Sequence, residues 1–122
     1  MKNTLDSNAL MQKTKTDIEI LIITGYYKGG DKLPTFEQFA KLHNVSVSTI
    51  RAVVKSLYAD DTLIRKPSIG YYVKPYCISI LKEKYKKLFS SQLKNIVENI
   101  KRFDFNIDDI DELRNILKEL LK

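Results

Sequence analysis

The feature that most constrains this chain is a pair of short amphipathic segments, each preceded by a hydroxyl residue and separated by a tight break at residues 44–45. Thr35 precedes the first segment and has Gln38 at the capping-box position, while Ser46 precedes the second and has Thr49 there. Two capped helices joined by so short a turn form a helix-turn-helix motif. The apolar residues at helical spacing are Phe36, Phe39 and Ala40 in the first segment and Val47, Ile50, Val53, Val54 and Leu57 in the second.

A β-hairpin is predicted directly after this motif. Residues 63–65 and 70–73 have the composition of strands, and residues 66–69 between them, which include a proline, are expected at the hairpin tip. A hairpin that follows a helix-turn-helix motif is a wing. Residues 8–75 are therefore predicted to form a winged helix-turn-helix domain.

The segment ahead of the motif is predicted to be a helix that runs to Thr24. Its apolar residues recur at steps of three and four, and Gly25 follows it, a residue that readily adopts the conformation ending a helix. Residues 1 to about 7 are expected to be a loose start.

The last part of the chain is predicted to be two helices, one from Ile78 to about Arg102 and one that follows Asn106, each with an apolar stripe. Two antiparallel stripes of unequal length leave apolar surface uncovered, and a second copy of the chain is the simplest cover. The expected fold class is thus mostly α with a small β wing, in which residues 76–122 form a helical dimerisation region. The expected dimerisation residues are Leu81, Tyr85, Leu88, Phe89, Leu93, Ile96 and Ile100.

Composition narrows the function. The 122 residues hold 21 Lys and Arg against 15 Asp and Glu, a net charge of +6, which favours anionic partners, nucleic acid before membrane surfaces. One cysteine and one histidine allow no intrachain disulfide and no zinc site, so no metal or cofactor is expected. The sequence has no Gly-rich phosphate loop and no paired-carboxylate motif, which disfavours an enzyme. No signal peptide is evident and the longest apolar run, residues 20–23, is too short for a membrane span, so a cytoplasmic protein without a membrane partner is expected.

Three motifs point to a known family. Residues 30–35 read Gly-Asp-Lys-Leu-Pro-Thr, residues 45–53 read Val-Ser-Val-Ser-Thr-Ile-Arg-Ala-Val, and residues 70–73 read Gly-Tyr-Tyr-Val. In order and spacing, residues 14–73 resemble the winged helix-turn-helix domain of GntR-family bacterial transcription regulators. The remaining two helices resemble the short C-terminal region of the YtrA subfamily.

This resemblance implies a sequence-specific DNA-binding regulator, expected to be a repressor that binds an inverted repeat in double-stranded DNA as a homodimer. Arg51 would read a base edge from the recognition helix, whereas the alternative is a solvated surface arginine. The hydroxyl residues at the helix starts would contact phosphates, with simple capping as the alternative. Lys66 at the wing would hold a phosphate, or else be a solvated hairpin lysine. The full set of expected DNA-binding residues is Thr35, Ser46, Ser48, Thr49, Arg51, Lys55, Lys66, Ser68 and Gly70.

The sequence also departs from the family pattern. Glu37 and Val47 stand where the family has arginines that contact DNA, and Asp61 and Ser68 stand where glycines are usual. Glu37 and Val47 favour the alternative function, a winged-helix scaffold for protein interaction that does not bind DNA. The identity of any small-molecule effector is left open by the sequence.

Two further residues are predicted to be structural. His43 is expected to be partly packed at a helix C-terminus, and Cys77 to be a small packed residue rather than a redox sensor.

Overall fold

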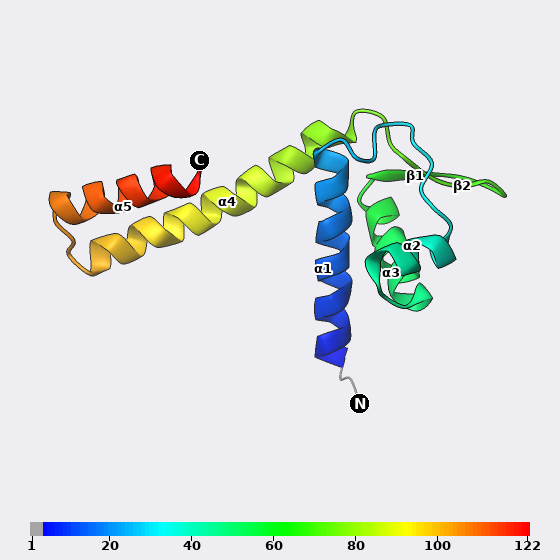
Figure 1. Cartoon of the computed structure of the whole chain (residues 1–122), viewed down its shortest axis with the longest axis horizontal. Coiled ribbons are helices and arrows are strands. Elements are labelled where there is room, and N and C mark those ends of the chain that lie inside the picture. Colours follow the sequence, from blue (N-terminus) through cyan, green and yellow to red (C-terminus); the bar gives the residue numbers. More distant parts are fainter. Residues whose placement is uncertain (1–3) are drawn as a thin grey trace. The chain divides into compact units, whose positions relative to one another are not determined.

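The computed structural model describes residues 4–122, in which five helices and a two-stranded antiparallel sheet follow one another in the predicted order (Figure 1). The chain divides into a first compact unit that ends at Lys84 and a second unit, Tyr85–Lys122. The mostly helical fold with a small β wing is thereby confirmed.

The first helix, α1 (Thr4–Ile23), begins earlier than predicted. The expectation of a loose start is wrong for residues 4–7, which are helical, while residues 1–3 lie outside the described part of the chain. The helix ends at Ile23, one residue before the predicted end at Thr24. Gly25 has a φ of +87°, in the left-handed region that glycine adopts without steric cost.

The predicted helix-turn-helix consists of α2 (Phe36–His43) and α3 (Val47–Ala59). The Thr35 hydroxyl accepts a hydrogen bond from the Gln38 amide at 3.3 Å, and the Gln38 side chain accepts one from the Thr35 amide at 3.2 Å, which completes the capping box. The Ser46 hydroxyl accepts from the Thr49 amide at 3.1 Å. Asn44 turns the chain between the two helices in a left-handed conformation, with a φ of +54°.

The wing is a hairpin of β1 (Leu63–Lys66) and β2 (Gly70–Val73). Its antiparallel register pairs Leu63 with Val73 and Lys66 with Gly70, so the turn is confined to residues 67–69. The loop before α2 runs along the other edge of β2, where the Leu33 amide donates to the Tyr71 carbonyl at 2.9 Å. The wing is thus tied to the start of α2.

The hydrophobic core of the first unit draws on α1, α2, α3, the wing and the first turns of α4 (Cys77–Arg102). Leu81 on α4 is only 3% exposed and packs in this core. It was expected on a dimer surface, but its side chain is covered within its own chain. The largest fully buried side chains in the core are Phe39, Ile18, Ile22, Ile50, Leu57 and Leu63.

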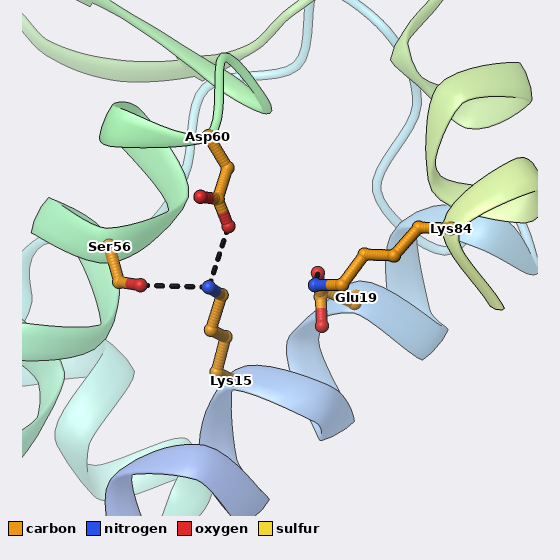
Figure 2. A network of polar contacts seen from close by, with 5 residues as sticks. All are labelled: Lys15, Glu19, Ser56, Asp60 and Lys84. Carbon is orange, nitrogen blue, oxygen red and sulfur yellow. Dashed lines mark hydrogen bonds and ion pairs between the residues drawn. The ribbon is translucent and has the colours of Figure 1, made fainter. Parts of the chain in front are cut away.

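Two ion pairs join α1 to other elements of the first unit (Figure 2). The Lys15 ammonium, on a side chain that is 10% exposed, lies 2.6 Å from the Asp60 carboxylate and 2.8 Å from the Ser56 hydroxyl. One turn along, the buried Glu19 carboxylate pairs with Lys84 of α4 at 2.7 Å. These contacts fix α1 against the end of α3 and against the start of α4.

The second unit contains the rest of α4 and α5 (Ile107–Leu120). Asn106 caps α5 by accepting from the Asp109 amide at 2.9 Å. None of the helices in residues 4–122 is long and apolar enough to cross a membrane. Many apolar side chains of this unit are exposed, among them Leu88, Phe89, Leu93, Ile96, Val97, Ile110, Leu113, Ile116 and Leu117.

Candidate nucleic-acid interface

The two sides of α3 differ in burial and in charge. Ile50, Val53, Val54 and Leu57 are buried in the core, so the opposite side of the helix faces solvent. That side presents Ser48, Arg51 and Lys55, all exposed. Within the described part of the chain none of these three side chains makes a hydrogen bond or an ion pair, so their donors are available to a ligand.

A first groove lies beside the N-terminus of α3. It has a volume of about 550 Å³ and separates this helix start from the first turns of α1. The Ser46 hydroxyl lies 2.9 Å from that of Thr49, which orders both groups at the helix end where amides favour anions. Ser46, Ser48 and Thr49 are therefore brought together, as predicted, along one wall of this groove.

A second groove, of about 330 Å³, lies between the start of α2 and the wing. It brings the other group of predicted residues together, since Thr35, Lys66, Ser68 and Gly70 all line it. Lys55 lines neither groove.

The second groove also holds two cations that sequence reasoning missed, Lys32 and Arg65. Lys32 approaches the wing so closely that a Cβ on Gly70 would lie 3.3 Å from its Cε, and Gly70 itself has a φ of +138°. The available signal for Arg65 was its place beside Lys66 in a segment already predicted to be a strand of the wing. Lys32 had no such signal, since only the folded loop places it beside the wing.

Lys66 at the end of β1 is exposed, and its ammonium lies 4.3 Å from the centre of the Tyr72 ring. This cation–π contact keeps the lysine against the wing while leaving N–H donors on its outer side for a phosphate.

Aromatic rings link α2 and α3 to the wing. Phe36 and Tyr71 stack with centroids 6.0 Å apart and planes 26° apart, and Tyr58 meets Tyr71 edge to face at 6.0 Å. We call Phe36, Tyr58 and Tyr71 the aromatic cluster. The Arg51 guanidinium lies 5.7 Å from the Phe36 ring centre, and that of Arg65 lies 5.9 Å from the Tyr71 ring centre.

The two departures from the arginine pattern have different surroundings. Val47 packs against the hydrophobic core, so this position is used for packing. Glu37 is exposed in the first turn of α2, where a carboxylate is favoured by the helix dipole.

His43 and Cys77 are packed, as predicted. His43 is half-buried edge to face against Phe39, with ring centres 5.1 Å apart, and burial lowers its pKa. Cys77 is 2% exposed, and burial raises the pKa of its thiol, which disfavours the reactive thiolate. Among residues 4–122, no three His, Cys, Asp or Glu side chains are grouped so as to hold a metal ion.

The site can be compared with known proteins. The profile of the family described as bacterial regulatory proteins, gntR family, matches residues 10–73. The fold is similar to that of a GntR family transcriptional regulator from Listeria monocytogenes, with a TM-score of 0.70 and 20% identity over 86% of this chain and 91% of that one. It is also similar to a transcriptional regulator from Oenococcus oeni, with a TM-score of 0.68 and 15% identity over 100% of this chain and 94% of that one. No curated protein matches the chain.

Proposed function

The chain belongs to the gntR family of bacterial regulatory proteins and is a DNA-binding transcriptional regulator, and we propose that it acts as a repressor. In this proposal it is a homodimer in a bacterial cytoplasm, and it binds an operator that is an inverted repeat. The observation that carries the proposal is the exposed side of α3. Its Arg51 and Lys55 have no polar partner within residues 4–122, while the opposite side is fully used by the core.

We assign base reading to α3 and phosphate binding to the surrounding residues. Arg51 is the group whose fork of donors matches O6 and N7 of guanine in the major groove. Ser46, Ser48 and Thr49 offer hydroxyls and amides to phosphates at the helix start, and Lys55 lies one turn beyond Arg51 on the same exposed side. In the groove between α2 and the wing, the phosphate contacts are assigned to Thr35, Lys66, Ser68 and Gly70, together with Lys32 and Arg65.

The dimer is supported by the second unit. Its exposed apolar side chains include Leu88, Phe89 and Leu93, which are 47%, 54% and 56% exposed. Association of two copies would cover these exposed apolar side chains, and a two-fold axis presents two equal DNA-binding units to two half-sites. The proposed dimer residues are Tyr85, Leu88, Phe89, Leu93, Ile96 and Ile100, and Leu81 is omitted because it is buried in the first unit.

Repression is proposed because it requires only occupancy: a dimer bound across a promoter excludes other proteins from that DNA.

A protein-interaction scaffold without DNA affinity is the second candidate. The exposed Glu37 carboxylate favours it, because it would repel a phosphate in the place where the family has an arginine.

Site selection from a random pool of duplex DNA tests the proposal. We expect the purified chain to recover duplexes that share an inverted repeat, and the logarithm of the affinity to fall linearly with that of the salt concentration, with a slope that reports several phosphate contacts. Placed across a promoter, the selected duplex should lower expression of a reporter when the chain is present. A well-folded chain that enriches no sequence and binds no duplex at low salt would support the scaffold instead.

A further inference from the structure

The aromatic cluster restrains the one arginine of the recognition helix. Its rings come from three elements: Phe36 is the first residue of α2, Tyr71 lies on β2, and Tyr58 lies near the end of α3. Phe36 and Tyr71 are half-buried and pack against the core. The position of the Phe36 ring is therefore fixed by the packing of the first unit.

Arg51 lies over the Phe36 ring at 5.7 Å, within the range of a cation–π contact. Because Arg51 is exposed and has no hydrogen bond or ion pair among the described residues, this ring face is the contact that restrains its guanidinium.

We propose that Phe36 is a positioning residue for DNA recognition, which holds the Arg51 guanidinium ready to read a base edge. The proposal rests on the function proposed above. A ring face engages the π surface of a guanidinium and leaves its N–H donors unused, so the arginine remains able to pair with a base. An arginine restrained before binding also loses less side-chain entropy when the complex forms.

A purely structural role for Phe36 makes a different prediction. If the ring served only to cover the core, leucine would replace it with little effect on Arg51. Phe36→Leu is therefore the critical variant, because it removes the ring. Phe36→Tyr keeps a ring face at this position. Tyr58→Leu is the matched control, since Tyr58 contacts Tyr71 and not Arg51. Melting curves followed by circular dichroism establish that all three variants are folded.

The first arm of the test uses the full chain without DNA. The arginine side-chain N–H resonances are recorded by NMR, and Arg51 is assigned by its loss in Arg51→Ala. We expect the ring current of Phe36 to displace the Arg51 signal in the unaltered chain, in Phe36→Tyr and in Tyr58→Leu, and the displacement to vanish in Phe36→Leu. An Arg51 signal that does not move in Phe36→Leu would overturn the proposal.

The second arm measures affinity for the duplex recovered by site selection and for a scrambled duplex. Phe36→Leu is expected to weaken binding to the selected duplex about two- to fivefold per half-site, and to leave the scrambled duplex unaffected. Phe36→Tyr should recover the affinity.

In an Arg51→Ala background Phe36→Leu should have no further effect. An equal loss in that background would show that Phe36 acts through packing and would also overturn the proposal. Failure of the unaltered chain to bind any duplex would instead overturn the proposed function, whichever way the Arg51 resonance behaves.

Discussion

At the scale of single residues, Arg51 and Lys66 are both exposed cations, yet they lie on different elements and have different expected roles. Arg51 projects from the middle of α3, while Lys66 lies at the wing against Tyr72. Arg51→Ala is expected to cost about 1–3 kcal/mol per half-site on the selected duplex and to relax discrimination at one base pair. Lys66→Ala should weaken binding to all duplexes alike and lower the salt slope by about 1 per subunit. Titrations of both variants on selected and scrambled duplexes check this, and equal losses on both duplexes for Arg51→Ala would contradict its base-reading role.

Two positions that depart from the family pattern carry backbone strain. Asp61 and Ser68 stand in place of glycine and keep its left-handed conformation, with φ of +62° and +66°. The strain of such a conformation is about 1–2 kcal/mol for a residue with a Cβ. Glycine's added freedom in the unfolded chain offsets about 0.4–1 kcal/mol of this.

Ser68→Gly and Asp61→Gly are therefore each expected to raise the free energy of unfolding, by up to about 1.5 kcal/mol. Urea denaturation measures it. Gly25→Ala, at a φ of +87°, is the control of opposite sign and should destabilise the chain. A loss of stability in both glycine variants would show that the Asp61 and Ser68 side chains outweigh their strain.

The sole histidine gives a pH dependence with a defined sign. Because burial lowers the pKa of His43 in the folded chain, the unfolded chain takes up the proton first as the pH falls. The contribution of the neutral imidazole to stability is thus complete above its unfolded pKa, near 6.5, and is lost as the pH drops through the folded value. His43→Leu should flatten the change in unfolding free energy between pH 7.5 and pH 5.5. An unchanged pH profile in that variant would assign the dependence to other groups.

At the scale of elements, α1 is held by charge as well as by packing. Asp60→Asn keeps the shape at the end of α3 but removes the partner of a nearly buried Lys15 ammonium, so we expect a loss of about 1–3 kcal/mol in unfolding free energy. The neighbouring Asp61→Asn is the matched control. Its carboxylate is 81% exposed and 3.8 Å from Lys74, and its loss should change stability by less than about 0.5 kcal/mol. Similar effects of the two substitutions, measured by urea denaturation, would show that the Lys15 pair is not stabilising.

The helices, their caps and the wing could be predicted because each is encoded within a few neighbouring residues. Thr35 and Ser46 bond to amides three residues away, and the apolar spacing of α3 matches its buried side. Contacts between distant segments have no such local signal. The pairing of Lys15 with Asp60, and the stacking of Phe36 on Tyr71, depend on how elements pack and could not be predicted. The early start of α1 was missed because residues 4–7 are mostly polar.

At the scale of the whole molecule, the proposed dimer depends on residues beyond the first unit. That unit runs to Lys84 and includes Cys77 and Leu81 in its core, together with the Lys84 pair to the buried Glu19. A chain cut after Lys84 keeps all of these contacts. A chain cut after Lys74 loses the buried Leu81, worth about 1.5–3 kcal/mol, together with the smaller buried Cys77 and the ion pair of Glu19, and should be destabilised.

The chain cut after Lys84 should therefore fold, remain monomeric and bind the selected duplex weakly, whereas the full chain should be a dimer at micromolar concentration. The physical reason is that the six proposed dimer residues include four large apolar side chains about half exposed in one copy, Leu88, Phe89, Leu93 and Ile96. Because each side chain is already about half covered, burying the rest gains about 0.8–1.5 kcal/mol apiece, so the eight side chains of two copies contribute roughly 6–12 kcal/mol against an association cost of roughly 4–15 kcal/mol. The other exposed apolar side chains of this unit add to that gain. Leu93→Glu in the full chain should then shift the mass measured by sedimentation equilibrium toward the monomer, because it places a charge in the apolar interface. A control at an exposed polar position of the same helix, Lys94→Glu, should leave the dimer intact, and a full chain that sediments as a monomer without any substitution would refute the assignment of dimerisation to this surface.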